Sequence, residues 1–417
     1  MKMNSTFKND DYVRRYPAGD AVAQLDFLED IHDIESETKW LRGKIYNTAV
    51  KCINCGPLFA GQLLKDHKIY GNDEEAVLST ITDGSAMGYS AGSQFMYSWA
   101  PDDEGRQYYL LTQQAFDALA GLAGSDCPAY RRRTNERKES ELNYDLTTLP
   151  EGKEILVQVS SLVNKITNIH IGWYNVFRKD KLLYGITDIF DEKYHGYEFK
   201  GGIYSHSGIY AKWAFPDQAE EILELYEGTI AKKAPLMSFE DAVPVVSFYT
   251  SDSGETAATL SAYLEKDNYY RMKIGNVVKV LHKGETSEQT VIDAAGDLFA
   301  KFKDLVAAMA ALVNININYP IPCMLNAGIA VCGLNKNHLL KAIEEFKDMY
   351  GEDPDGVTGN DIFYVLQRAL YNMRLDDKVG EAKTEDCEEA LLKLLSPTFS
   401  WDSYDTSVIS VNVKTEE

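Results

Sequence analysis

The sequence predicts an α+β protein whose central, mostly antiparallel sheet lies between N-terminal and C-terminal helical regions. Apolar residues recur at steps of three and four near both ends of the chain, which is the spacing of amphipathic helices. In the middle, apolar and polar residues alternate and turn residues separate the alternating runs, as in hairpins. We therefore divide the chain into an N-terminal helical region (1–104), an α+β core (105–284) and a C-terminal helical region (285–417).

The N-terminal region begins with a polar segment, residues 1–18, which we expect to be a loosely held arm. From Asp20 to Gly71 the apolar spacing predicts three helices, with the sequences AVAQLDFLEDIHDI, ETKWLRGKIYNTAVKCI and LFAGQLLKDH. The second helix is expected to begin at Ser36 or Thr38 and to end before the pair Gly56-Pro57.

The core region carries most of the strand signals. We predict a strand at QYYLLT (107–112), followed at once by the helix QQAFDALAGLAG, and further strands at EILVQVSS, WYNVFR and LLYGITDIF. The segment YEFKGGIYSHSGIYAKWAFP (197–216) predicts a hairpin, because SHSG supplies turn residues between two aromatic-rich runs. A short helix, DQAEEILELYEG, then precedes an antiparallel meander over residues 243–283.

The C-terminal region returns to helical spacing from Ser287 onward. The segment SEQTVIDAAGDLFAKFKDLVAAMAALV is long enough to form one major helix. Three further helices are expected at HLLKAIEEFKDMYG, DIFYVLQRALYNM and DCEEALLKLL.

Composition describes an acidic protein with one less acidic window. The 417 residues include 64 Asp and Glu against 42 Lys and Arg, a net charge of −22, which repels nucleic acid on average. Residues 128–185 nevertheless hold ten basic and seven acidic side chains, whereas residues 336–417 hold nine basic and eighteen acidic ones. A locally basic surface within an acidic chain can still bind a polyanion.

Other features bear on the cellular compartment. Six cysteines in a chain of this length do not indicate a disulfide scaffold. The first residues lack the apolar core of a signal peptide, and the apolar run at 305–313 is too short to span a bilayer. We expect no membrane partner and a location in the cytoplasm of a bacterial host.

The stretch TSDSGET (250–256) tests for a phosphate-binding or catalytic loop. A Walker loop requires a lysine after its second glycine, and a nucleophile elbow requires two glycines around a serine. This stretch has one glycine, Gly254, and no lysine. It is interpreted as a turn or bulge between strands.

Metal and catalytic motifs are weak throughout. The single C-x-x-C, Cys52 to Cys55, lacks a second ligand pair, so two packed thiols are favoured, with a zinc or redox site as the alternatives. The seven histidines form no ligand spacing, and EDPDGVTGND has its glycine at the wrong position for a calcium loop. We therefore expect no catalytic residues, no metal and no cofactor, and a protein that is not an enzyme.

The sharpest functional signal is a combination of basic and aromatic side chains. Guanidinium and ammonium groups hold phosphates, and aromatic rings stack on bases, which is how proteins bind single-stranded nucleic acid. The alternative is that these cations pair with the chain's own carboxylates and form a solvated face. The candidate nucleic-acid-binding residues are Tyr130, Arg131, Arg132, Arg133, Arg137, Lys138, Trp173, Tyr174, Arg178, Lys179 and Lys181.

Several short motifs resemble the phage/plasmid-like domain-of-unknown-function family over residues 105–370. They are YLLTQQAFDALAGLAG, CPAYRRR, EILVQVSS with the later Trp173-Tyr174, LHKG at 281–284, NKNHLLKAIEEFKDMYG and TGNDIFYVL. TSDSGET resembles the family's Asn-Ser-Glu-Val-Gly stretch, although Ser251-Asp252-Ser253 replaces its polar residues. The usual C-x-N-G is also absent, and residues 272–276 stand in its place. The resemblance implies an origin in a mobile element and no established activity.

These observations favour a phage or plasmid protein of DNA metabolism that binds or anneals single-stranded DNA, as in recombination, without covalent catalysis. Two alternatives stay open. An acidic anti-defence protein or DNA mimic would bind a host protein through its carboxylates, and a virion structural protein would use its 26 tyrosines in subunit interfaces. Each of these roles is compatible with a homo-oligomer.

Overall fold

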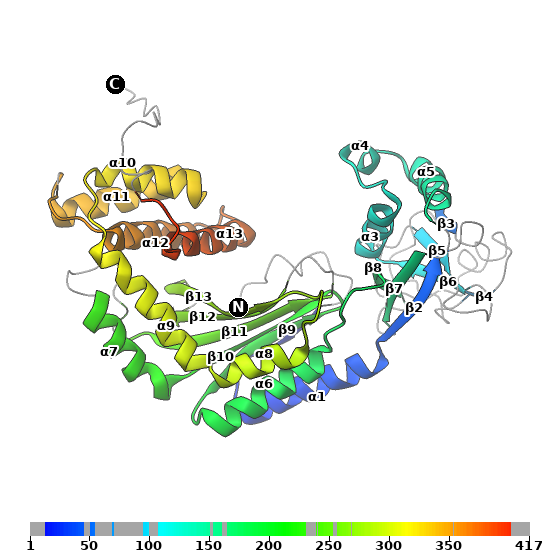
Figure 1. Cartoon of the computed structure of the whole chain (residues 1–417), viewed down its shortest axis with the longest axis horizontal. Coiled ribbons are helices and arrows are strands. Elements are labelled where there is room, and N and C mark those ends of the chain that lie inside the picture. The colour runs from blue at the N-terminus through cyan, green and yellow to red at the C-terminus, as the bar shows by residue number, and fades with distance from the viewer. Residues whose placement is uncertain are drawn as a thin grey trace.

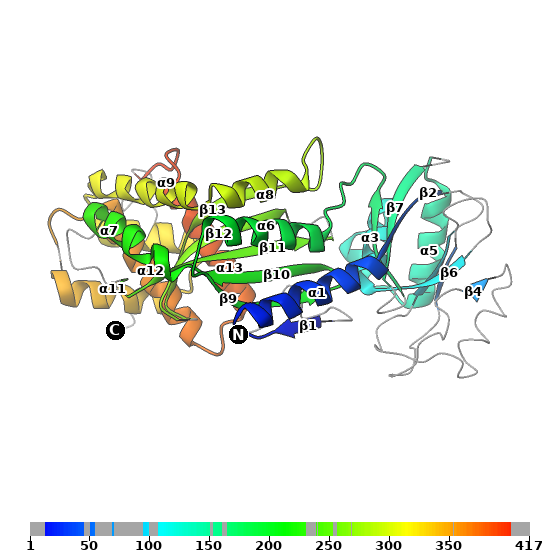
Figure 2. The ribbon, with the colours of Figure 1, turned by 90° about the horizontal axis from the view of Figure 1, so that it is seen from below.

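The computed structural model describes residues 13–45, 51–54, 69–70, 95–99, 107–150, 153–160, 165–230, 239, 241–252, 257–267, 269–352 and 354–401. It confirms the α+β class, with helices towards both ends of the chain. It contains two sheets rather than one, and Figures 1 and 2 show them in two lobes, side by side along the long axis of the molecule.

The six-stranded sheet of the first lobe is antiparallel throughout. Its strand order is β1-β9-β10-β11-β12-β13, and every neighbouring pair is antiparallel. The predicted hairpin is confirmed as β9 and β10, and the predicted meander as β11 to β13. The bounds are β1 Val13–Tyr16, β9 Glu198–Ser205, β10 Gly208–Ala214, β11 Val243–Ser251, β12 Ala258–Glu265 and β13 Arg271–Val280.

One face of this sheet carries a helical layer, visible below the sheet in Figure 1. Its helices are α1 (Ala21–Glu37), α6 (Lys179–Lys193), α7 (Ala219–Ile230), α8 (Glu288–Gly296) and α9 (Leu298–Ala310). Alternate strand residues such as Trp213, Phe248 and Leu260 are completely buried in the same apolar cluster as helix residues such as Phe27 and Phe190. Burial of this apolar surface is the main force that holds the layer to the sheet.

The C-terminal helices form the other end of the first lobe (Figure 1). They are α10 (Pro320–Asn326), α11 (Lys336–Tyr350), α12 (Gly359–Leu375) and α13 (Glu381–Leu391). Thr358 begins α12 with a reciprocal capping box to Asp361, which satisfies two otherwise free backbone or hydroxyl donors. Glu388 of α13 accepts from Arg271 of β13 and from Arg374 of α12, so ion pairs as well as apolar contacts join these helices to the sheet.

The second lobe is formed by the chain between α1 and α6. Its sheet has the order β2-β7-β8-β6-β5-β3, with β4 pairing β6, and only β6 and β8 run parallel among its described pairs. The residue boundary 104/105 falls inside this sheet, between β5 and β6. The bounds are β2 Lys39–Ile45, β3 Lys51–Asn54, β4 Ile69–Tyr70, β5 Phe95–Trp99, β6 Gln107–Leu111, β7 Lys153–Ser160 and β8 Lys165–Ile171, with helices α3 Gln113–Ala123, α4 Pro128–Arg131 and α5 Asn135–Thr147.

Four element predictions are corrected by the structure. The segment from Ser36 to Ile53 was expected to be a helix, but it contains β2 and most of β3, because residues 39–45 pair with residues 153–159 of β7. LLYGITDIF was expected to be a strand but lies in α6, where Leu182, Ile186 and Phe190 fall on one buried face at helical spacing. WYNVFR is a connection, and the long helix after Ser287 is broken at Asp297 into α8 and α9.

Other predictions fall outside the described residues. The expected helix LFAGQLLKDH lies there entirely, and so do residues 1–12 of the expected arm, whereas residues 13–16 form β1. Among the helices in the described ranges, none is long and apolar enough to cross a bilayer.

We predict that Phe190→Ala strongly destabilises the first lobe. Phe190 is fully buried, and its ring lies 5.1 to 6.0 Å from those of Tyr194, Tyr197, Trp213 and Phe215. Removing such a ring costs about 3–5 kcal/mol through lost burial and the cavity that remains. Urea unfolding followed by circular dichroism measures this loss. Met349→Ala, at a side chain that is 50% exposed on α11, is the control and should change the midpoint little.

Candidate functional site at the junction of the two sheets

The candidate nucleic-acid-binding residues divide into two groups. Tyr130 to Lys138 lie on α4, α5 and the turn between them, in the second lobe. Trp173 to Lys181 lie in the connection from β8 to α6 and in the first turn of α6. Figure 1 shows α4 and α5 at the top of the second lobe, whereas α6 begins lower down, where the lobes meet. The two groups therefore do not form one continuous surface in this structure.

Carboxylates neutralise most of the first group. Arg131 makes two parallel bonds to Asp126, of 2.8 and 2.9 Å. Arg133 and Arg137 both pair with Glu141. Arg132 is exposed and makes no ion pair with a described carboxylate. The alternative of internal pairing thus holds for three of the four arginines.

Tyr130 is not a surface residue, contrary to the prediction. Only 3% of it is exposed, and its hydroxyl donates to the carbonyl of Lys138 at 3.1 Å. Its ring packs against Phe116 of α3. Tyr130 therefore joins α4 to α3 and is closed to a ligand.

Lys179 is likewise an interior residue rather than a phosphate ligand. It is completely buried, and its ammonium donates to Glu35 at 3.0 Å and to Asp252. Glu35 comes from the end of α1 and Asp252 from the turn after β11, so the ammonium joins three elements of the first lobe. Tyr204 of β9 donates to the same Glu35 oxygen at 3.0 Å. We call Glu35, Lys179, Tyr204 and Asp252 the buried charge cluster.

Side chains of the second lobe complete this cluster. Gln158 of β7 donates its amide to Asp252 at 2.8 Å. The Gln158 carbonyl oxygen in turn accepts from Thr167 at 2.8 Å and from Asn168 at 2.6 Å, both on β8. All three second-lobe residues are almost fully buried. The polar network therefore crosses from one sheet to the other.

Burial and charge act in opposite directions on the ionisable groups of the cluster. Desolvation favours the neutral form of Lys179, but the charges of Asp252 and Glu35 outweigh it, so the pKa of Lys179 is raised. Desolvation also raises the pKa of Glu35, against the attraction of Lys179. One ammonium between two carboxylates leaves a formal surplus of one negative charge. Glu35 is therefore the group that burial drives towards its protonated form.

A column of rings lies beside the cluster. His170 stacks on Tyr174 with centroids 3.9 Å apart and planes 6° apart, and Tyr174 stacks on His282 at 5.2 Å and 2°. Trp40 extends the column on the side of His170 at 5.9 Å. Tyr174, also predicted at the surface, is buried at the centre of this column. Its prediction as an exposed base-stacking residue is corrected by these contacts.

Both histidines of the column are neutral at physiological pH. Burial lowers the pKa of His170 to about 4 and that of His282 to about 4. His170 donates from Nε2 to the carbonyl of Asp252. His282 donates from Nδ1 to the carbonyl of Asn175 at 3.1 Å, which leaves Nε2 to accept from the Thr250 hydroxyl at 3.0 Å. His170 therefore joins β8 to the turn after β11, and His282 joins the connection between β8 and α6 to the end of β11.

The turn in TSDSGET is confirmed as far as the structure describes it. β11 ends at Ser251, and Asp252 lies in a turn; residues 253–256 are outside the described ranges. No local sequence pattern indicates that Asp252 is 1% exposed and pairs with Lys179. A carboxylate and an ammonium 73 positions apart become recognisable as partners only when the fold is known.

The exposed part of the site centres on Trp173. This residue lies in the connection between β8 and α6 and is 62% exposed. Arg42 of β2, which the sequence analysis did not single out, is exposed and donates to the carbonyl of Gly172, the neighbour of Trp173. Lys181 is exposed in the first turn of α6. Arg178 instead pairs with Asp180, through bonds of 2.9 and 2.5 Å.

Metal binding finds no support in the described part of the chain. No three His, Cys, Asp or Glu side chains lie close enough there to share an ion. Of the C-x-x-C motif, Cys55 and the side chain of Cys52 lie outside the described residues. The buried Cys332 and Cys387 are free thiols.

We predict that Lys179→Met destabilises the protein by about 3–5 kcal/mol, because two carboxylates then lie buried without a cation. Adding Glu35→Gln and Asp252→Asn should recover most of this loss. The single variant should also regain stability as pH falls, since protonation neutralises Glu35, whose pKa is raised by burial. Urea unfolding between pH 5 and 8 measures both effects. A single variant as stable as the wild type would contradict the assigned role of the ammonium.

We predict that His170 and His282 make the protein sensitive to acid. Their folded pKa values of about 4 lie below the ordinary 6.5, so unfolded histidines bind protons that the folded ones do not. The free energy of unfolding therefore has its full value above pH 6.5. It decreases as pH drops towards 4, by up to about 3 kcal/mol for each histidine. His170→Gln with His282→Asn keeps a hydrogen-bond donor at each position. Unfolding curves of this variant should depend less on pH than those of the wild type.

A comparison with protein-family models, with curated proteins and with solved structures finds no match to this chain. The resemblance to the phage/plasmid-like family therefore stays a prediction from the short motifs quoted above.

Proposed function

We propose that this protein binds single-stranded DNA at the junction of its two lobes, as a non-catalytic accessory of DNA metabolism. Trp173 would be the stacking platform, and Arg42 and Lys181 would hold phosphates beside it. The proposed ligand is the one predicted from the sequence. The proposed binding site, however, lies at the junction and not at the run of arginines at 131–133.

The exposed indole of Trp173 is the observation that carries the proposal. Trp213 and Trp401 are buried, at 0% and 5% exposure, and Trp40 belongs to the ring column, whereas Trp173 is 62% exposed. Burying a large apolar ring is favourable by a few kcal/mol, and an exposed ring does not contribute this free energy. A stacked base would cover such a ring, and stacking contributes about 1–3 kcal/mol per base.

The backbone that carries Trp173 is held on both sides. The Gly172 amide donates to Glu154 and the Tyr174 amide donates to Ile171, each at 3.1 Å. Asn175 donates from its backbone to His282 at 3.1 Å and from its side chain to Gly284 at 2.7 Å. The indole is therefore exposed on a fixed support, and a ligand would lose little conformational entropy in using it.

Arg42, which bonds to the neighbour of Trp173, and Lys181, in the first turn of α6, lack the carboxylate partners that neutralise the arginine run. Arg42 bonds to a backbone carbonyl, which leaves its charge in place, and Lys181 makes no ion pair with a described carboxylate. The rest of the protein is strongly acidic and would repel a polyanion. Contact would accordingly be confined to a short length of strand, with two or three phosphates neutralised.

We predict that Trp173→Ala weakens binding of a fluorescein-labelled thymidine oligonucleotide by roughly 5- to 100-fold, the equivalent of one lost stack. Arg42→Ala or Lys181→Ala should each reduce the slope of log K against log salt by about 0.7. Fluorescence anisotropy from 20 to 200 mM salt gives both quantities.

Two controls make this experiment decisive. Tyr144→Ala removes an aromatic side chain that is 70% exposed on α5, away from the junction, and should leave affinity unchanged. Joint replacement of Arg131, Arg132 and Arg133 by alanine should have a smaller effect than loss of Trp173. No binding at 20 mM salt, or equal affinity of Trp173→Ala and wild type, would refute the proposal. The anti-defence and virion alternatives stay predictions.

A further inference from the structure

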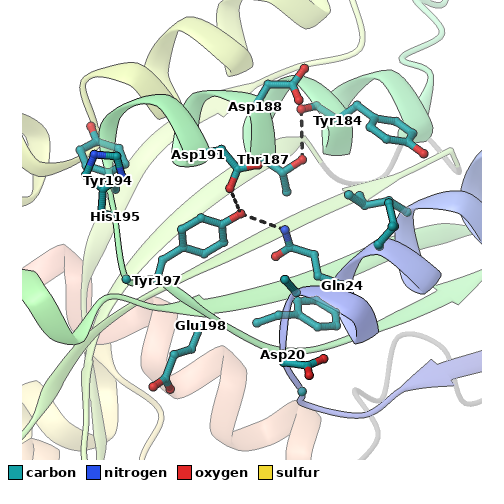
Figure 3. Close-up of a pocket in the computed structure, with 16 residues that line it drawn as sticks. Asp20, Gln24, Tyr184, Thr187, Asp188, Asp191, Tyr194, His195, Tyr197 and Glu198 are labelled. Atoms are coloured by element: carbon teal, nitrogen blue, oxygen red, sulfur yellow. Dashed lines mark hydrogen bonds between the residues drawn. The ribbon is translucent and has the colours of Figure 1, made fainter.

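A cavity of about 690 Å³ opens on the helical layer of the first lobe. It lies between the start of α1, the last turns of α6 and the segment that leads into β9 (Figure 3). Its volume is within the usual range for small-molecule sites, roughly 300–1,000 Å³. The residues that line it are all described and belong to the first lobe, away from the junction.

The cavity is acidic. Asp20, Asp188, Asp191 and Glu198 line it, and the lining residues include no lysine or arginine. Asp20 caps α1 through the amides of Val22 and Ala23, and Glu198 is paired with Lys200 at 2.5 Å. Asp188 and Asp191 remain as two exposed carboxylates one turn apart on α6. They give the cavity its uncompensated negative charge.

The walls are aromatic and apolar. Tyr184, Tyr194 and Tyr197 line the cavity with Phe199 and Leu25. Leu25 is 48% exposed. The faces of tyrosine rings attract cations, and an exposed leucine offers a contact for methylene groups.

Tyr197 is fixed in place. Its hydroxyl donates to Asp191 at 2.6 Å and accepts from the amide of Gln24 at 2.9 Å, as the dashed lines in Figure 3 show. The Gln24 carbonyl oxygen in turn accepts from the indole of the buried Trp213 at 3.0 Å. A chain of hydrogen bonds from the core therefore fixes the position of the Tyr197 ring relative to the Asp191 carboxylate.

We propose that this cavity binds a linear polyamine, an alkyl chain that carries two or more ammonium groups. The ammonium groups would pair with Asp188 and Asp191 and lie against tyrosine rings, while the methylene groups contact Leu25 and Phe199. An anion is excluded by the charge. A bare divalent ion fits poorly, because such ions prefer several converging oxygen ligands and the described residues contain no such group. This inference does not depend on the proposed DNA binding.

The test is isothermal titration of the full chain with spermidine. We expect saturable binding in 100 mM sodium chloride, weakened at least tenfold by the nearly isosteric pair Asp188→Asn and Asp191→Asn. Glu344→Gln with Asp348→Asn removes two exposed carboxylates of α11 and is the matched control, which should keep the wild-type affinity. Leu25→Lys places a cation at the cavity and, because this side chain is half exposed, should fold normally and abolish binding.

Three results would overturn the inference. One is the absence of saturable heat with the wild type. Another is equal weakening by the α6 pair and the α11 pair, which would mean that spermidine only condenses around an acidic protein. The last is loss of the saturable heat when magnesium chloride replaces sodium chloride at equal ionic strength, because charge alone would then account for binding.

Discussion

The ammonium of Lys179 between Glu35 and Asp252 is the interaction on which the arrangement of the lobes depends. It gathers the end of α1, the start of α6 and the turn after β11 at one point, and Gln158 extends the contact to the second sheet. A buried ion pair adds little net stability compared with apolar packing, but an unpaired buried charge is heavily penalised. The cluster therefore acts chiefly by making other arrangements of these elements unfavourable.

The ring column and the exposed indole follow from this constraint. The chain leaves β8, passes Trp173 and Tyr174, and enters α6 at Lys179, so the cluster fixes one end of the connection and β8 fixes the other. Tyr174 is drawn inward between His170 and His282. Trp173, the adjacent residue, points to solvent. The indole of Trp173 is therefore held at the surface because its neighbour Tyr174 is buried. No packing contact of the indole itself is needed to hold it there.

The sequence was informative where local signals decide structure. Alternation and turn residues correctly placed β9 to β13, because each strand pairs with its neighbour in the chain. The segment 36–53 was misread as helix because β2 is defined by pairing with β7, more than one hundred residues later. The burial of individual side chains could not be predicted from the sequence for the same reason. Lys179, Tyr174 and Tyr130 have the composition of a binding surface, and only distant partners such as Asp252 show that they are internal.

The cavity and the buried charge cluster, which lies beside the proposed DNA site, share one pair of helices. The cavity lies between the start of α1 and the end of α6, and the buried charge cluster lies between the end of α1 and the start of α6. A ligand at one end can influence the other only if it prefers a different arrangement of this pair. Any arrangement that draws Lys179 away from Glu35 leaves buried charge unpaired, which costs several kcal/mol. The cluster thus holds both helices in one arrangement, and the two sites should bind their ligands independently.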